Sequence, residues 1–256
     1  MSSCSGALER TFSVDAREIA FPVYGTRGIG DVPSQLCGTA FAIGGGVFAT
    51  AAHVLRCASQ HPQSAVGFVP AGTGGRPTRT TEALIDDVEH LSDFDVALFY
   101  CKGGPYRALP WERTSVPLLT EFTCFGYPYG LDSALKRITV RGYRGVISAQ
   151  HPLEQLPASP EGYELSVPAA RGLSGAPVLT TAGLRVVGII SMNAQSQMLV
   201  ASDTESVSQD GKQTIVERYE FLTYGLAVGS NALVGLNSTL LGSSIGDHLA
   251  RHGLLA

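Results

Sequence analysis

Hydrophobic residues recur along the chain in short runs, which glycine, proline and polar residues separate. Runs this short that are bounded by turn residues are typical of β-strands. Turn-forming residues at 44–46 and 181–183 predict tight connections between neighbouring strands. The predicted strands cover residues 39–43, 47–50, 65–69, 95–101, 122–127, 138–148, 177–180, 184–192 and 221–228.

Helical patterns are rare. Residues 51–58 are expected to form two helical turns, and residues 231–241 and 243–252 are expected to form a helical tail, whose second part opens with a typical serine cap. The glycine- and proline-rich segment 102–117 is expected to link two β units. Segment 195–217 is expected to be an exposed loop or a β-ribbon, and connections of this length are usually functional or disordered. The predicted layout is two all-β halves and a helical tail.

Composition and charge exclude several classes of protein. Hydrophobic residues make up 44% of the 256 residues, which is enough for a sizeable core. The net charge is −4 and no basic stripe is present, so nucleic-acid binding is not expected. No apolar run is long enough for a membrane span. The polar segment 1–10 lacks the apolar core of a secretory signal, which predicts a cytoplasmic protein.

Cysteine and glycine patterns predict neither a metal nor a cofactor. The five cysteines include no CxxC pair, so structural zinc is not expected, and most of them are expected to be reduced core residues. The glycine-rich segments 44–46 and 72–75 form neither a P-loop nor a GxGxxG before a helix. A nucleotide-binding enzyme is therefore discounted.

His53 follows a predicted strand through the small residues Thr50, Ala51 and Ala52. Such neighbours leave an imidazole beside the backbone, with one ring nitrogen free for a substrate. His53 is one of six histidines, and a lone histidine is more often a core or surface residue. The preceding small residues distinguish it from the others.

Asp95 lies directly before the apolar strand that begins at Val96. A carboxylate at a buried strand start is costly unless it has a partner, and a histidine N–H would be one. That contact would also fix the histidine tautomer. Taken alone, Asp95 is as well explained as a solvated turn acid, and Asp93 is a rival one step further from the strand.

Ser174 lies in the segment Gly172-Leu173-Ser174-Gly175. Glycines permit backbone angles that direct successive N–H groups to one spot beside the serine hydroxyl. Acyl transfer needs this arrangement, with the N–H groups of Gly172 and Ser174 as the oxyanion hole. A Gly-Ser-Gly turn is also common in itself. The nucleophile elbow of α/β-hydrolases is excluded, since no G-x-S-x-G precedes a helix here.

Four segments together resemble the trypsin-like serine peptidases: residues 37–41 (CGTAF), 50–53 (TAAH), 95–98 (DVAL) and 172–177 (GLSGAP), in that family's order. Residues 187–193 and 224–231 are similar to the high-temperature-requirement (HtrA) branch of bacterial proteases, although the residues after Asn231 are too few for that branch's PDZ module. The resemblance implies an all-β fold of two six-stranded antiparallel β-barrels. The first would span residues 1–110 and carry the histidine and aspartate. The second would span 111–235 and carry the serine, before a helical tail over 236–256.

The resemblance also implies a serine endopeptidase that acts on proteins or peptides. Ser174 would be the nucleophile, His53 its base and Asp95 the residue that orients the base, with a hydrogen bond from Ser191 to Asp95. An uncharged pocket would favour a small or medium apolar side chain at P1, the substrate residue before the scissile bond. The residues implied for this pocket are Pro168 at its base and Ser191, Met192 and Asn193 in its wall.

Three positions depart from the family pattern, of which Ala176, where glycine is usual, is a small change. Leu173 replaces the polar residue that usually precedes the nucleophile, so activation by a newly cut N-terminus is not expected. Cys57 lies four residues after His53 instead of directly after it, so the family's disulfide, here Cys37 to Cys57, is not expected.

Three alternatives stay open. The first is a latent protease that a partner activates, as in bacterial signalling or defence systems. The second is a catalytically silent scaffold on the same fold, and the third is an esterase with the same three residues. All three positions are filled, which favours catalysis over the scaffold.

Overall fold

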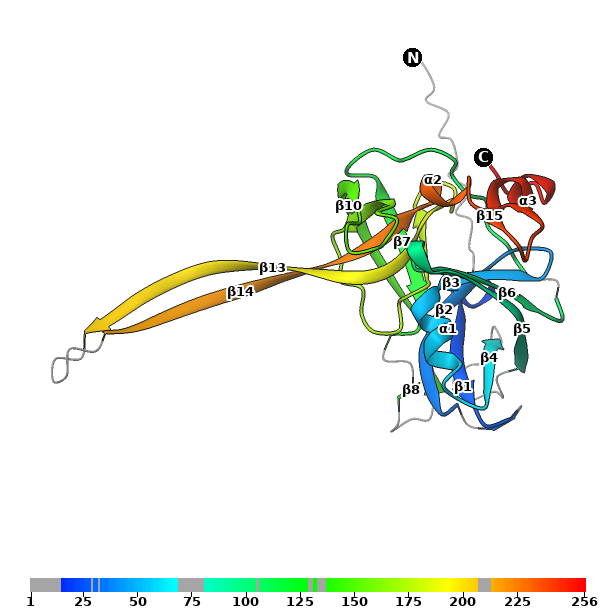
Figure 1. Cartoon of the computed structure of the whole chain (residues 1–256), viewed down its shortest axis with the longest axis horizontal. Helices are drawn as coiled ribbons and strands as arrows, with labels where there is room; N and C mark the ends of the chain where they lie inside the picture. Colours follow the sequence, from blue (N-terminus) through cyan, green and yellow to red (C-terminus); the bar gives the residue numbers. More distant parts are fainter. Residues whose placement is uncertain are drawn as a thin grey trace, which may run out of the picture.

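The computed structural model describes residues 15–28, 30–31, 33–68, 81–104, 106–128, 131–132, 137–206 and 213–256. Most of these residues form two closed antiparallel barrels of six strands each, so the predicted fold class is confirmed (Figure 1). Within these ranges, no helix is both long and apolar enough to cross a membrane.

The first barrel closes in the order β1-β2-β3-β6-β5-β4. The predicted turn at residues 44–46 joins β2 to β3, and all three glycines have positive φ angles of 98°, 62° and 80°. Buried aromatic rings fill the centre, with Phe48 stacked on Phe99 at 5.4 Å between ring centroids. The strands are β1 (Phe21–Thr26), β2 (Gln35–Gly44), β3 (Val47–Ala51), β4 (Gln63–Phe68), β5 (Thr81–Leu91) and β6 (Val96–Cys101).

The second barrel closes in the order β10-β11-β14-β13-β12-β7. Two of its strands continue far beyond the barrel as a two-stranded ribbon, paired from Met192 opposite Leu226 to Ser206 opposite Gln213 (Figure 1). Of the two interpretations of segment 195–217, the β-ribbon is confirmed for residues 195–206 and 213–217, and residues 207–212 lie outside the described residues. The strands are β7 (Glu121–Gly126), β10 (Arg141–Pro152), β11 (Glu161–Leu165), β12 (Pro177–Thr180), β13 (Val186–Ser206) and β14 (Gln213–Gly229), beside a small pair, β8 (Leu131–Asp132) and β9 (Arg137–Ile138).

Three barrel strands, β1, β5 and β11, are missing from the sequence prediction. All six residues of β1 are buried, so its sequence shows no alternation, and it contains both proline and glycine. Strand β5 carries the acidic residues Asp86 and Asp87 in its interior, and β11 is a five-residue strand that contains two glutamates. In each case the pairing with neighbouring barrel strands outweighs the low strand propensity of the local sequence.

The predicted helix over residues 231–241 is wrong. The chain forms the short helix α2 (Ser230–Leu233) and then the strand pair β15 (Asn237–Ser238) and β16 (Ser243–Ser244). The carboxylate of Glu89 in β5 explains the change, because it accepts hydrogen bonds from the backbone N–H groups of Thr239 (2.8 Å) and Leu240 (3.1 Å) and so holds the segment in a turn. The final helix, α3 (Ile245–Arg251), is confirmed, with Ser244 as its cap instead of Ser243.

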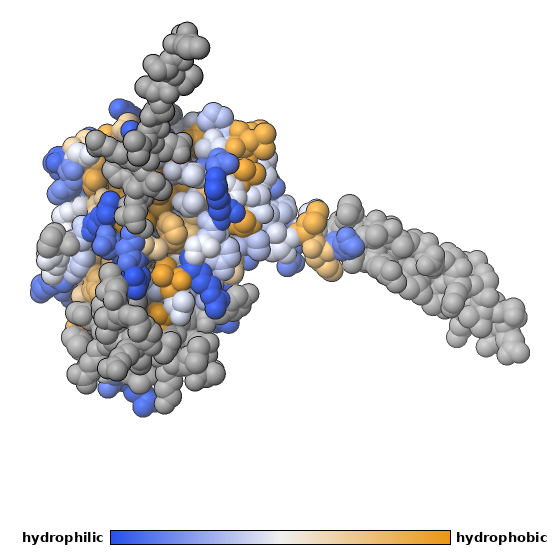
Figure 2. Space-filling view, turned by 180° about the vertical axis from the view of Figure 1, so that it is seen from behind, coloured by the Kyte–Doolittle hydropathy of each residue, from blue (hydrophilic) through white to orange (hydrophobic). Residues whose placement is uncertain are grey.

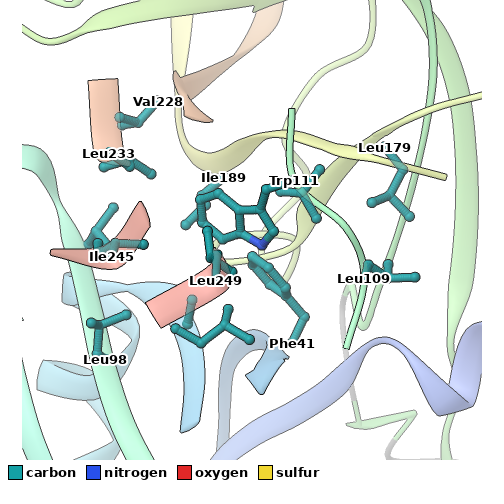
Figure 3. Close-up of a cluster of buried hydrophobic side chains, with 14 of the residues drawn as sticks. Phe41, Leu98, Leu109, Trp111, Leu179, Ile189, Val228, Leu233, Ile245 and Leu249 are labelled. Carbon is teal, nitrogen blue, oxygen red and sulfur yellow. The ribbon is translucent and has the colours of Figure 1, made fainter. Parts of the chain in front are cut away.

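A shared core joins the two barrels and the C-terminal segment (Figure 3). Trp111, from the linker between the barrels, is 1% exposed and packs against Phe41 at 5.9 Å between ring centroids. Its backbone N–H donates to Leu254 O over 2.6 Å, and its carbonyl accepts from Ala256 N over 3.0 Å. The linker is therefore held between the barrels and the end of the chain.

Candidate active site

His53 lies in the first turn of α1 (Ala52–Ala58), which starts directly after β3. The first N–H groups of a helix have no partners within the helix. Here Ala52 N donates to the backbone carbonyl of Asp95 over 2.9 Å, and His53 N donates to Asp95 Oδ1 over 3.1 Å. The start of the helix thus fixes the backbone of the histidine against the aspartate.

Asp95 lies between the short 3₁₀ helix η2 (Ser92–Phe94) and β6, with a left-handed backbone (φ 49°, ψ 38°) that aspartate adopts more readily than most residues. It is 6% exposed, and its Oδ2 lies 2.8 Å from His53 Nδ1. Ser191 Oγ donates to the same oxygen over 2.6 Å, which confirms the predicted Ser191 bond. The rival Asp93 is exposed within η2.

Burial raises the pKa of the Asp95 carboxyl, but hydrogen bonds from His53 and Ser191, together with the charge of His53, outweigh it and lower the pKa. The carboxylate is therefore held in its charged form. Such a group fixes the orientation of an imidazole and stabilises the imidazolium that forms when that ring accepts a proton.

Arg56 is a neighbour of Asp95 that the sequence reasoning missed. Its guanidinium Nη2 lies 3.5 Å from Asp95 Oδ1, and its side chain is 52% exposed. The available signal was its position three residues after His53 on the helix, because residues at this spacing share a face.

Ser174 lies in the loop between β11 and β12, flanked by Gly172 (φ 103°) and Gly175 (φ 81°). A side chain at Gly172 would collide with the carbonyl of Tyr127, and one at Gly175 with the side chain of Thr50. Both positions thus require glycine for their angles and for space.

The loop that carries Gly172 and Ser174, called the nucleophile loop after the predicted role of Ser174, is attached to the first barrel by Thr39, a second residue that the sequence reasoning missed. Thr39 N donates to Ser174 O over 2.9 Å, and Thr39 Oγ1 donates to Gly172 O over 2.8 Å. With the carbonyls of the loop bound from one side, the N–H groups of Gly172 and Ser174 have no partner among the described residues. Two unpaired N–H groups beside a serine hydroxyl are what an oxyanion requires.

The hydroxyl of Ser174 donates to Ser191 O over 3.3 Å. Within the described part of the chain, no hydrogen bond joins it to His53. The structure therefore brings His53, Asp95 and Ser191 into one hydrogen-bonded line. Ser174 contacts this line through the backbone carbonyl of Ser191.

The four implied pocket residues occupy different environments. Asn193 Nδ2 donates to Ala169 O over 2.8 Å, and its Oδ1 accepts from Ala169 N over 2.6 Å. Met192 packs against the core that the barrels share, whereas Pro168 is exposed and Ser191 is buried. Asn193 is thus the residue that bridges β13 to the segment before the nucleophile loop.

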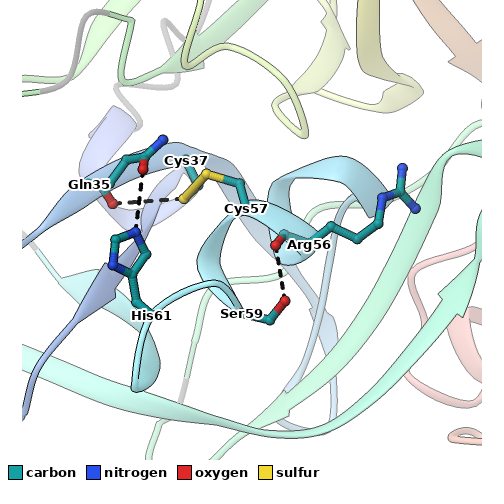
Figure 4. Close-up of a disulfide and its surroundings, with 6 residues drawn as sticks. All are labelled: Gln35, Cys37, Arg56, Cys57, Ser59 and His61. Carbon is teal, nitrogen blue, oxygen red and sulfur yellow. Dashed lines mark hydrogen bonds between the residues drawn. A yellow bond between two sulfur atoms is a disulfide. The ribbon is translucent and has the colours of Figure 1, made fainter.

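A disulfide joins Cys37 in β2 to Cys57 in α1, with 5.7 Å between their Cα atoms, so the expectation that this bridge is absent is wrong (Figure 4). The reason is helical geometry: Cys57 follows His53 by four residues and so lies on the same face of α1, within reach of β2. Cys101 and Cys124 are free and buried, as predicted, while Cys4 lies outside the described residues.

Residues 38–189 match the family model of the trypsin-like peptidase domain. No curated protein sequence matches the chain.

Among solved structures, the HtrA-type protease AlgW with a decapeptide has a TM-score of 0.58 at 15% identity, over 93% of this chain and 66% of that one. The MamO protease domain from Magnetospirillum magneticum has a TM-score of 0.56 at 15% identity, over 87% of this chain and 98% of that one. The active form of the Rv3671c protease from M. tuberculosis has a TM-score of 0.54 at 17% identity, over 86% and 79%. At these identities the likenesses show a shared fold.

Proposed function

Because the chain belongs to the family of trypsin-like peptidases, we propose that it is a serine endopeptidase that cleaves proteins or peptides through an acyl-enzyme intermediate. The observation that carries the proposal is the hydrogen-bonded line Ser191–Asp95–His53, in which the carbonyl of Ser191 accepts a hydrogen bond from the Ser174 hydroxyl. Beside that hydroxyl lie two N–H groups that have no partner among the described residues. Nothing in this machinery requires a metal or a cofactor.

In the proposed reaction, the Ser174 hydroxyl turns from Ser191 O towards His53, which accepts its proton as the oxygen attacks the substrate carbonyl. The N–H groups of Gly172 and Ser174 stabilise the oxyanion. His53 then gives the proton to the leaving amine, and the resulting ester with Ser174 is hydrolysed by water along the same route. Asp95 stays charged throughout, in keeping with its lowered pKa.

The substrate backbone can be placed from the same contacts. When the Ser174 hydroxyl leaves Ser191 O, that carbonyl becomes free to accept the N–H of the P1 residue. In this proposal the P1 side chain extends towards Asn193, which two hydrogen bonds hold to Ala169. The proposal is therefore a preference for small apolar P1 residues, such as alanine.

Latency until a partner binds is the second candidate, and one observation favours it: the Ser174 hydroxyl is bonded to Ser191 O instead of to His53. Casein cleavage by the pure protein at ordinary protease rates would exclude the need for a partner. Full activity only after addition of a cell extract, by contrast, would support it.

The test is active-site labelling of the pure protein with a fluorophosphonate probe, followed by mass-spectrometric mapping of the modified residue. The expected result is labelling at Ser174 that is lost in Ser174→Ala. A protein that stays unlabelled, or that is labelled to the same extent after this substitution, would overturn the proposal in favour of the silent scaffold. Comparison of matched peptide and ester substrates separates a peptidase from an esterase.

A further inference from the structure

Asp95 has a charged neighbour that the proposed reaction does not use. Its Oδ2 lies 2.8 Å from His53 Nδ1 and accepts a hydrogen bond from the hydroxyl of Ser191 over 2.6 Å. Its Oδ1 accepts the backbone N–H of His53 over 3.1 Å and lies 3.5 Å from Nη2 of Arg56. The two oxygens of one carboxylate therefore face two basic side chains, an imidazole that titrates and a guanidinium that is always charged.

The position of Arg56 follows from the helix that carries it. Residues three apart on a helix share a face, so Arg56 lies on the face of α1 that carries His53. The next residue, Cys57, is tied to β2 by the disulfide, and the Arg56 side chain extends away from that bridge (Figure 4). The backbone around Arg56 is thus anchored to Asp95 on one side and to β2 on the other, which keeps the guanidinium close to the carboxylate.

The rest of the first barrel supplies little charge to this helix. The strands that pack against α1 are β1, β2, β3, β4 and β6, and none of them contains an Asp, Glu, Lys, Arg or His residue. From the second barrel, β13 presents the uncharged hydroxyl of Ser191 to the site before it leaves the body as the ribbon (Figures 1 and 2). The charge of Arg56 is therefore not balanced by the elements on which α1 rests.

Among the described residues, Arg56 is the one permanently charged cation that pairs with Asp95. On β5, partial burial and the charge of Arg56 lower the pKa of His90, so this second imidazole adds little positive charge at neutral pH. Asp93 on η2 and Arg171 in the nucleophile loop are both exposed to solvent, where charges are screened. The charge balance at Asp95 is therefore set by His53 and Arg56.

A cation beside Asp95 changes what the carboxylate can do for His53. A carboxylate favours the charged form of a neighbouring imidazole, whereas a nearby positive charge disfavours that form. Arg56 draws on the same negative charge that would stabilise the imidazolium, and its own charge opposes that of the ring. His53 then stays neutral, which is the form that accepts the Ser174 proton, down to a lower pH.

We propose that Arg56 is a positioning residue that acts on His53 through Asp95 and keeps this base neutral in mildly acidic solution. The enzyme would then work at a lower pH than the line Ser191–Asp95–His53 alone would allow. The inference rests on the proposed function, because it concerns the base of that reaction. Arg56 contacts no reacting atom in that reaction, and its 52% exposed side chain acts through its charge.

The first experiment measures kcat/KM against pH for a casein peptide that the native protein cleaves. Arg56→Gln should move the acid limb of the profile upward by about half a pH unit, which is about a threefold loss on that limb. Arg56→Lys keeps the charge and should keep the limb of the native protein. Arg144→Gln is the matched control, because it removes an exposed arginine from an ion pair with Glu121 in the second barrel. A limb that stays in place in Arg56→Gln, or that moves equally in Arg144→Gln, would overturn the proposal.

Salt separates the charge of Arg56 from its packing. Because the side chain is half exposed, the displacement of the acid limb should shrink in sodium chloride at about 1 M, where the Debye length is about 3 Å. A displacement caused by altered packing of α1 would keep its size in salt, and that result would overturn the proposal.

His53 can also be titrated without any cleavage, which keeps this inference separate from the proposed function. In Ser174→Ala protein, the NMR signal of the His53 ring should titrate with a midpoint about half a pH unit higher when Arg56→Gln is added. A higher midpoint in a chain whose unaltered form cleaves nothing would uphold the role of Arg56 and reject the peptidase. An unchanged midpoint would overturn the role of Arg56, even for an active peptidase.

Discussion

The hydroxyl of Ser191 in the second barrel donates a 2.6 Å hydrogen bond to Oδ2 of Asp95 in the first, the same oxygen that lies 2.8 Å from His53 Nδ1. Ser191→Ala should lower kcat/KM about tenfold, because a hydrogen bond to a charged group contributes roughly 1.5–3 kcal/mol and part of it orients His53. Steady-state kinetics on a casein peptide measures this. Ser230→Ala is the control, since that buried serine donates to Glu112 O away from the site. Equal activity in both variants would contradict the role of Ser191.

The positive φ of Gly172 and its closeness to Tyr127 O give a second prediction. Gly172→Ala should displace the Gly172 N–H and lower kcat by about 10²–10³ with little change in KM, because the oxyanion loses a donor. Gly183→Ala is the matched control: its φ of 96° is similar, but a Cβ there, in the β12–β13 turn, would come no closer than 4.0 Å to another group, the Arg185 side chain. It should cost about 1 kcal/mol of stability and leave kcat intact. Comparable losses of kcat would instead indicate a general effect of backbone strain.

The contact of Asn193 with Ala169 predicts how the P1 preference can be changed. Asn193→Gly removes the bridging amide and should raise kcat/KM for peptides with leucine at P1 about tenfold relative to alanine at P1. Asn193→Gln keeps both the donor and the acceptor of the amide that bonds Ala169 and should leave the preference for alanine. Paired peptides that differ only at P1 provide the measurement. A native enzyme that already cleaves both peptides equally well would refute the role of Asn193.

Glu89 makes the stability of the folded protein depend on pH. Its pKa is lowered: partial burial acts to raise it, but hydrogen bonds from Ser238, Thr239 and Leu240 outweigh that effect. A carboxyl with a lower pKa in the folded state adds stability above its ordinary pKa, and this contribution is lost as the pH falls through the folded value. Glu89→Gln should therefore cost about 1 kcal/mol at neutral pH, and the difference from the native protein should shrink below about pH 4.

Denaturant unfolding at several pH values tests the Glu89 prediction. Glu154→Gln is the control, because Glu154 is exposed. A Glu89→Gln deficit that stays constant from neutral to acid pH would show that the carboxylate charge is not what holds the turn.

The bridge between Cys37 and Cys57 should stabilise the fold and the position of α1. It joins residues 20 apart in sequence, for which loop closure predicts about 3 kcal/mol. Dithiothreitol should lower the free energy of unfolding of the native protein by about this amount and should have no effect on the Cys37→Ala/Cys57→Ala double variant. If the native protein resists the reductant while its thiols titrate as free, the bridge contributes nothing to stability.

Local sequence patterns predict those strands and turns whose own residues determine their structure. Strands such as β2, β3 and β12 are short apolar runs bounded by turn residues, and the glycine turn at residues 44–46 is equally clear, so their own residues predict their structure. Strand β1 contains proline and glycine, and β11 is short and contains two glutamates, so both depend on their neighbours in the barrel ladder. The turn after α2 depends on Glu89, which lies about 150 positions earlier in the chain, and no local pattern shows such a contact.

The same difference between local patterns and contacts of distant residues applies to the candidate site. The local sequences around His53, Asp95 and Ser174 showed which residues to consider, and the family's order suggested the bond from Ser191. The contacts of Arg56 and Thr39 were missed because they cross between elements, and the disulfide was wrongly excluded because the helical path from His53 to Cys57 was not taken into account. The direction of the Ser174 hydroxyl is a matter of side-chain rotation, which a sequence does not encode.

Thr39 holds the nucleophile loop of one barrel from the other barrel, through two hydrogen bonds. The proposed nucleophile Ser174 and its proposed base His53 thus come from separate halves of the polypeptide, and neither half contains all of the proposed catalytic residues. A chain divided within the linker should for this reason yield two inactive fragments whose reassembly restores hydrolysis. In that format, turnover would report directly on the docking of one barrel against the other, and the protein could serve as a split-enzyme reporter.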